Sequence, residues 1–248
     1  MKNKSRDECL KCLNHYFSES GEMSYNCEDN IVDNILNIFD RGKYTYRDNP
    51  DLYIEFENQI LVIEHFEFDW YNTLSKKGSV GRREKARIDR RFEEGSKKEN
   101  VLIHDAFKGE TSFDNYISNV KKGFDHHYNR IEEYISNLKA KSVITPKKTV
   151  SIMFVIENTS PLGCTYEDEQ GCVRPCSLAE CREFLLHIKD KSKVDYILAL
   201  SEDWNCKNRC LITTANLDDY LETAVDYFDK HFLLSNPQVT GGFIKLNQ

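Results

Sequence analysis

Acids and one histidine interrupt an apolar stretch at residues 49–70, which read NPDLYIEFENQILVIEHFEFDW. Asp51 precedes the first half of this stretch, and Glu64, His65 and Glu67 follow an apolar run of four residues. Carboxylate oxygens are the ligands that Mg²⁺ prefers, and imidazole binds transition metals. Because buried carboxylates are usually paired or bound to a metal, these four side chains are candidates for a metal site.

The apolar residues on both sides of residues 57–59 predict a β-hairpin, and the length of its turn decides which side chains share a face. A two-residue turn at residues 57–58 pairs Asp51 with Glu64. A three-residue turn at residues 57–59 pairs Asp51 with His65 instead, and it separates apolar from polar side chains more fully. Two-residue turns are more frequent, but residues 57–58 lack the usual glycine. Both registers stay open, and Asp51 belongs to both.

The order of expected elements from residue 28 to about residue 156 is helix, three strands, helix, strand. This order resembles the PD-(D/E)xK nuclease-like family, and the motif residues that carry the resemblance are Asp51, directly after Asn-Pro, and Glu64 in VIEHF. The resemblance implies a restriction-endonuclease-like core in which both acids hold Mg²⁺ or Mn²⁺ over a phosphodiester. It also implies a lysine two residues after Glu64, where this chain has Phe66.

Two explanations of Phe66 lead to two functions. Some members of the family draw the lysine from another element, and Lys121 on the following helix is then the third catalytic candidate beside Asp51 and Glu64. This interpretation predicts a metal-dependent nuclease that hydrolyses DNA or RNA. Otherwise the fold has lost catalysis and serves as a module that binds nucleic acid or a protein partner. Lys121 would then cover the edge of the core with its aliphatic stem and extend its ammonium group into water.

Residues 76–98 concentrate positive charge on an otherwise acidic chain. They hold ten Lys or Arg against four Asp or Glu, a local charge of +6, while the 248-residue chain has a net charge of −7. A basic segment on an acidic body can bind phosphate groups, although many such segments only keep a surface solvated. The candidate residues for nucleic-acid binding are Lys76, Lys77, Arg82, Arg83, Arg87, Arg90 and Arg91.

Nine cysteines offer a second type of metal ligand. Two pairs with three intervening residues each suit a structural Zn²⁺ ion, which needs four ligands in a tetrahedron. These are Cys172, Cys176, Cys206 and Cys210. The alternative is a set of reduced thiols, which agrees with the odd number of cysteines. The polar N-terminus lacks the apolar segment of a signal peptide, so we expect a cytoplasmic location.

Apolar periodicity predicts a single α/β domain over residues 1–248, with a mixed β-sheet flanked by helices. The expected core spans about residues 28–230, with a basic insertion at about 71–110 and a helical N-terminal extension at 1–27. The clearest helix is predicted over residues 113–140. Further strands are expected at residues 44–47, 150–156, 194–200 and 210–214. The chain end is expected to be a tail with a turn at Gly241 and Gly242.

The bulk composition indicates an ordinary soluble protein, with 40% hydrophobic and 30% charged residues and a mean hydropathy of −0.62. No apolar run approaches the roughly 20 residues that a membrane-spanning helix needs, so we expect no membrane partner. A protein partner and a homo-oligomer both remain open.

Overall fold

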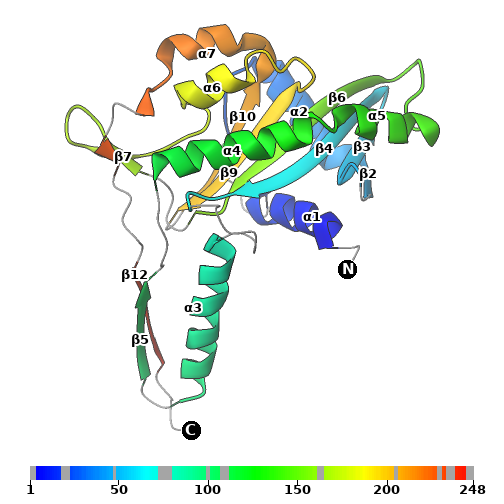
Figure 1. Cartoon of the computed structure of the whole chain (residues 1–248). Coiled ribbons are helices and arrows are strands. Elements are labelled where there is room, and N and C mark those ends of the chain that lie inside the picture. Colours follow the sequence, from blue (N-terminus) through cyan, green and yellow to red (C-terminus); the bar gives the residue numbers. More distant parts are fainter. Residues whose placement is uncertain are drawn as a thin grey trace.

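The computed structural model describes residues 4–17, 23–46, 49–71, 80–98, 101–106, 112–160, 165–203, 206–227, 231–232 and 238–243. Seven strands form one mixed sheet (Figure 1). In their order across the sheet they are β1 (Ser24–Tyr25), β10 (Cys206–Thr213), β9 (Tyr196–Asp203), β6 (Thr149–Asn158), β4 (Gln59–Phe68), β3 (Leu52–Phe56) and β2 (Lys43–Tyr46). The predicted mixed sheet is therefore confirmed.

The strands run in two ways within this sheet. β2, β3 and β4 form an antiparallel meander, whereas β4, β6 and β9 run parallel to one another. β10 returns antiparallel to β9, and the short β1 lies parallel to β10 at that edge. Parallel neighbours need a long crossover, and the chain between β4 and β6 supplies one that contains helices.

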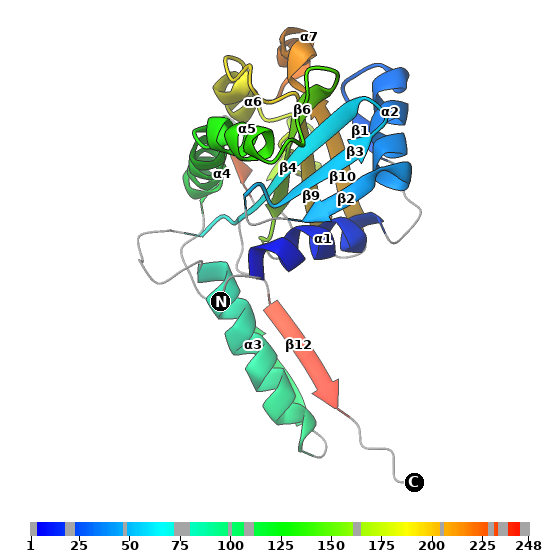
Figure 2. The same ribbon diagram turned by 90° about the vertical axis from the view of Figure 1, so that its right-hand side faces the viewer.

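Helices cover both faces of the sheet (Figure 2). On one face lie α1 (Lys4–Phe17) and α2 (Asp29–Arg41), and on the other lie α4 (Phe113–Tyr128), α5 (Ile131–Ala140), α6 (Arg182–Ile188) and α7 (Leu217–Thr223). Successive side chains of a strand point to opposite faces. Leu61 and Ile63 of β4 therefore join the layer of α1 and α2, while Val62 and Phe66 join the layer of α4. An apolar run with both faces covered explains why residues 60–63 show no polar alternation.

The N-terminal helix belongs to the core. Cys9, Cys12, Leu13 and Tyr16 of α1 are buried in the layer that α1 forms with α2. Their spacing places them on one helical face, which the sheet covers. The segment expected as an N-terminal extension therefore contributes part of the layer that covers the sheet.

The single helix predicted over residues 113–140 is wrong, because two helices occupy this segment. α4 ends at Tyr128, where the N–H of Arg130 bonds the carbonyl oxygen of His127, three residues back instead of four. Such a tight turn interrupts an α-helix. α5 then begins at Ile131 and continues the same buried layer above the sheet.

A small lobe projects from the main sheet (Figures 1 and 2). It consists of α3 (Val80–Ser96), which carries part of the basic segment, and a two-stranded sheet of β5 (Val101–Ala106) and β12 (Gln238–Phe243). The end of the chain therefore completes the lobe that the insertion begins. Gly241 and Gly242 lie inside β12, so the prediction of a C-terminal tail with a glycine turn is wrong.

The remaining elements are small. β7 (Thr165–Glu167), β8 (Val173–Pro175) and β11 (His231–Phe232) form a three-stranded sheet, and the 3₁₀ turn η1 (Thr214–Asn216) precedes α7. In the part of the chain that the structure describes, no helix combines the length and the apolar character that crossing a membrane requires.

Candidate functional site

The hairpin of β3 and β4 has the two-residue turn. Phe56 lies opposite Gln59, and Leu52 lies opposite Ile63, so the next pair along the same register is Asp51 with Glu64. Glu57 takes the first turn position with a φ of 50°, in the left-handed region that usually favours glycine. The three-residue alternative, which places His65 opposite Asp51, is therefore not the register of this structure.

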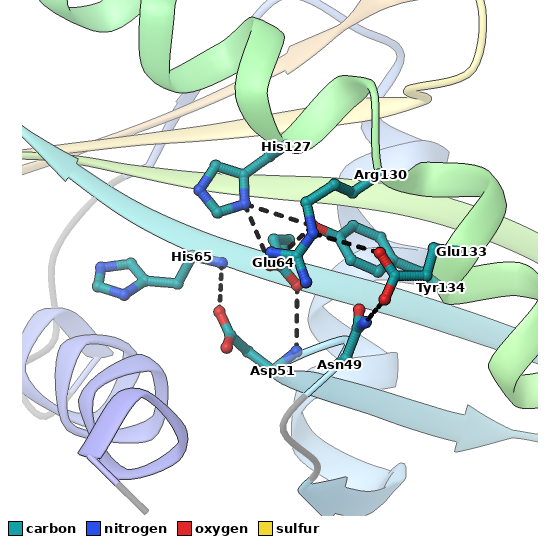
Figure 3. Close-up of polar contacts among 8 residues, drawn as sticks. All are labelled: Asn49, Asp51, Glu64, His65, His127, Arg130, Glu133 and Tyr134. Carbon is teal, nitrogen blue, oxygen red and sulfur yellow. Dashed lines mark hydrogen bonds and ion pairs between the residues drawn. The ribbon is translucent and has the colours of Figure 1, made fainter. Parts of the chain in front are cut away.

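Asp51 and Glu64 form a buried pair of carboxylates at the start of β3, with exposed fractions of 6% and 4%. The N–H of Asp51 donates to Oε2 of Glu64 at 3.1 Å, and the N–H of His65 donates to Oδ2 of Asp51 at 3.0 Å (Figure 3). Each carboxylate thus accepts a hydrogen bond from a main-chain N–H of the facing segment, just before the first residue of β3. These reciprocal bonds hold the two acids side by side.

The second oxygen of Glu64 is held from the helices above the sheet (Figure 3). The hydroxyl of Tyr134 on α5 donates to Oε1 of Glu64 at 2.9 Å, and Nδ1 of His127 on α4 lies 3.0 Å from the same oxygen. The break between α4 and α5 lies between these two residues. Glu64 therefore receives hydrogen bonds from a strand end and from two helices.

Sequence reasoning missed both helical partners of Glu64. The spacing did contain a signal, because His127, Ile131, Tyr134 and Leu138 recur at intervals of four, three and four residues. Three of these residues are buried, and the side chain of His127 is 15% exposed. A polar pair inside a buried stripe needs a polar partner across the interface, and Glu64 is that partner.

Burial and the neighbouring charge of Glu64 raise the pKa of Asp51 to about 6, although the hydrogen bond from the His65 N–H acts in the opposite direction. Burial and Glu64 also raise the pKa of Tyr134, so its hydroxyl stays a hydrogen-bond donor at neutral pH. Asp51 therefore gains or loses a proton near pH 6, as expected for a buried acid beside another carboxylate.

An aromatic ring occupies position 66, where the nuclease-like resemblance implies a lysine. Phe66 stacks on the imidazole of His127, with ring centroids 5.0 Å apart and an angle of 9° between the planes. A Cβ atom at Gly123 of α4 would come within 2.7 Å of the Phe66 ring, so only glycine permits this approach of α4 to β4. Lys121 lies elsewhere, with its ammonium group bonded to Glu183 of α6. The structure brings Asp51 and Glu64 together without Lys121.

The other two predicted metal ligands face the opposite layer. His65 and Glu67 share the face of β4 that α1 covers, whereas Glu64 faces α4. Nε2 of His65 lies 3.0 Å from Oε2 of Glu157 on β6, and the Cys12 thiol of α1 also bonds Glu157. The predicted set of Asp51, Glu64, His65 and Glu67 is thus divided by the sheet, because adjacent residues of a strand point to opposite faces.

Burial acts on the ionisable groups beneath α1 as well. It raises the pKa of Cys12, and the negative charge of Glu157 raises it further. Burial alone would raise the pKa of Glu157, but hydrogen bonds from His65 and Cys12 hold it below its usual range. Glu157 is therefore ionised beside a protonated thiol.

The basic helix presents its arginines on the projecting lobe. Arg83, Arg90 and Arg91 are exposed, and Arg87 pairs with Glu84 at 2.9 Å. Lys76 and Lys77 lie outside the described residues, as does the side chain of Arg82.

The four cysteines expected to bind zinc do not gather in the part that the structure describes. Cys172 is exposed, whereas Cys176 and Cys210 are buried, and the side chain of Cys206 lies outside the described residues. Among the described His, Cys, Asp and Glu side chains, the one group of three or more donors close enough for a metal is Cys12, His65 and Glu157.

Comparisons with other proteins add no assignment. No protein-family model, no curated protein and no solved structure matches this chain. The chemistry of the two carboxylates is therefore the basis for any functional conclusion.

Asp51→Asn is expected to change how stability depends on pH. A carboxyl group whose pKa rises on folding, here from about 3.9 to about 6, contributes stability below pH 4 that is lost as the pH rises through 6. The amide keeps an acceptor for the His65 N–H and cannot ionise. Urea unfolding should therefore show the variant up to about 3 kcal/mol more stable than wild type at pH 8, with the two curves converging at pH 4. Asp33→Asn, at an exposed position of α2, is the control. Its free energy of unfolding should vary with pH in the same way as that of wild type. A variant that is less stable at pH 8 would contradict the assignment.

Tyr134→Phe removes the hydroxyl that donates to Glu64. A hydrogen bond to a charged group contributes about 1.5–3 kcal/mol, so we expect the free energy of unfolding at pH 8 to fall by that amount. The matched control is Tyr128→Phe, since the Tyr128 ring stacks on Phe124 and its hydroxyl makes no hydrogen bond to a described residue. Equal losses in the two variants would show that the hydroxyl of Tyr134 does not stabilise Glu64.

Proposed function

We propose that this protein binds Mg²⁺ or Mn²⁺ through Asp51 and Glu64 and hydrolyses phosphodiester bonds of DNA or RNA. The observation that carries the proposal is the buried pair itself, held by reciprocal main-chain hydrogen bonds with the pKa of Asp51 raised to about 6. Two ionised carboxylates this close repel each other in a buried place. A divalent cation removes that repulsion, and perturbed acids of this kind cluster at functional sites.

The donor atoms suit a hard cation. Mg²⁺ and Mn²⁺ prefer carboxylate oxygens and keep several water ligands. Oδ1 of Asp51 has no hydrogen bond to any described residue, while Oδ2 bonds the N–H of His65. When bound, such a cation polarises the phosphate group and lowers the pKa of a coordinated water.

The protein's own groups prepare this pair for binding. Tyr134 and His127 fix the orientation of Glu64 by bonding one of its oxygens. His127 also lies against Phe66, which stands in the place of the family's lysine. We propose that the His127 imidazole serves in place of that lysine, as the basic group that holds or accepts a proton beside Glu64.

The order of elements and the basic lobe support the same function. α2, the three strands β2, β3 and β4, then α4 and β6 occur in the order that the nuclease-like resemblance implies, with α3 and β5 inserted before α4 and with α5 after it. α3 carries exposed Arg83, Arg90 and Arg91 away from an acidic body. Such a lobe would contact the phosphate backbone, and its binding would weaken steeply with salt.

A non-catalytic function has one observation in its favour. Both oxygens of Glu64 already accept hydrogen bonds from the protein, and an apolar ring occupies the place of the catalytic lysine. In that case the carboxylate pair is a structural device, and the basic lobe alone would bind nucleic acid or a protein partner.

Calorimetric titration of Mn²⁺ into metal-free protein, with digestion of plasmid and single-stranded nucleic acid alongside, separates the two functions. Wild type is expected to bind Mn²⁺ and to cleave. Asp51→Asn should lose both, with cleavage falling by at least about 100-fold, the scale of losing one electrostatic stabiliser of a transition state. His127→Gln should keep Mn²⁺ binding and lose cleavage.

The exposed Asp33→Asn substitution is the control for charge, and it should change neither measurement. Nucleic-acid binding by wild type without Mn²⁺ binding and without cleavage would refute the enzymatic proposal and leave the non-catalytic module.

A further inference from the structure

A second polar cluster lies beneath α1, on the face of the sheet opposite to His127 and Tyr134. Cys12 comes from α1, His65 from β4 and Glu157 from β6, so three elements meet there. Cys12 is 6% exposed, and the side chains of His65 and Glu157 are 6% and 19% exposed. A thiol, an imidazole and a carboxylate are the three donor types that proteins offer to Zn²⁺.

The distances within this cluster suit one metal ion. One donor atom from each residue lies within 4.8 Å of the other two, and Nε2 of His65 is 3.0 Å from Oε2 of Glu157. Donors on one tetrahedral Zn²⁺ lie about 3.3–3.8 Å apart, given bond lengths of about 2.0–2.3 Å. Small movements of the three side chains therefore place all donors at bonding distance.

The charge around the cluster favours a cation. Glu67 lies directly opposite Glu157 in the register of β4 and β6, so the two acids are neighbours on the face that α1 covers. Like charges at paired positions of a sheet repel, and burial strengthens that repulsion. A divalent ion on Glu157 offsets it, and Glu67 is the nearest carboxylate in the register for a fourth ligand position.

We propose that Cys12, His65 and Glu157 bind a divalent transition metal, which the donor set identifies as Zn²⁺. The thiol excludes Mg²⁺ and Mn²⁺ from this place, because those ions prefer oxygen ligands alone. The inference does not depend on phosphodiester hydrolysis at Asp51 and Glu64. It predicts two metal sites of different chemistry on the two faces of β4.

Such an ion would fasten α1 to the sheet. Cys12 is the ligand from the helix, and the other two ligands lie on adjacent parallel strands. His65 connects the two sites, since its ring bonds Glu157 while its N–H bonds Asp51. The ion would therefore also restrain the strand segment that positions Asp51.

Titration of Co²⁺ into metal-free protein tests the proposal, because Co²⁺ replaces Zn²⁺ and its absorption reports the ligands. Wild type is expected to develop the visible bands of a tetrahedral Co²⁺ site together with a near-ultraviolet thiolate-to-cobalt band, and added Zn²⁺ should abolish that thiolate band. Cys12→Ser should lose the thiolate band. The matched control is Cys9→Ser, since Cys9 is buried on the same helix outside the donor group, and it should keep the band.

Two further variants keep the test decisive. If Cys12→Ser does not fold by circular dichroism, Glu157→Gln removes one donor at nearly constant volume and should weaken Co²⁺ binding. Asp51→Asn should keep the thiolate band, which separates this site from the Mn²⁺ site. Absence of the band in wild type, or its persistence in folded Cys12→Ser, would overturn the proposal.

Discussion

A buried carboxylate needs hydrogen-bond donors, and the arrangement of strands and helices around β4 depends on how Glu64 obtains them. Its partners come from three places, namely the N–H of Asp51 just before the start of β3, His127 of α4 and Tyr134 of α5. Each of these hydrogen bonds requires a particular arrangement of the backbone. The two-residue turn sets the register that brings Asp51 to Glu64, and the break between the helices allows both helical partners to reach the strand.

β4 organises two polar clusters because its side chains alternate between two covered faces. Glu64 points to α4 and α5, while His65 points to α1 and Glu157. Asp51 joins the clusters through the main chain, since it bonds the N–H of His65 and lies beside Glu64. The oxygen-rich pair suits a hard cation such as Mg²⁺, whereas the thiol and imidazole suit a softer one. The two proposed metal sites thus follow from the chemistry of neighbouring residues on one strand.

The fold class followed from sequence because apolar runs of strand length and amphipathic helices are strong local signals. The hairpin register did not follow from the sequence. Glu57 adopts a backbone conformation that glycine usually takes, and no glycine at the turn indicated its length. The apolar periodicity continues almost unchanged through the break between α4 and α5, so residues 113–140 looked like one helix. The periodicity alone therefore did not show that His127 and Tyr134, on two separate helices, both reach Glu64. β12 was not predicted for a different reason. It pairs with β5, a strand more than a hundred residues away in sequence, and no local pattern reports such a partner.

Anomalous diffraction from crystals soaked in Mn²⁺ tests the central claim most directly, because it locates the ion without reference to activity. The account predicts a manganese peak bonded to carboxylate oxygens of both Asp51 and Glu64, with Tyr134 still bonded to Glu64. The Cys12, His65 and Glu157 cluster should show no manganese peak in the same crystal. A fully soaked crystal without manganese between Asp51 and Glu64 would contradict the account and leave the pair as a purely structural feature of the hairpin.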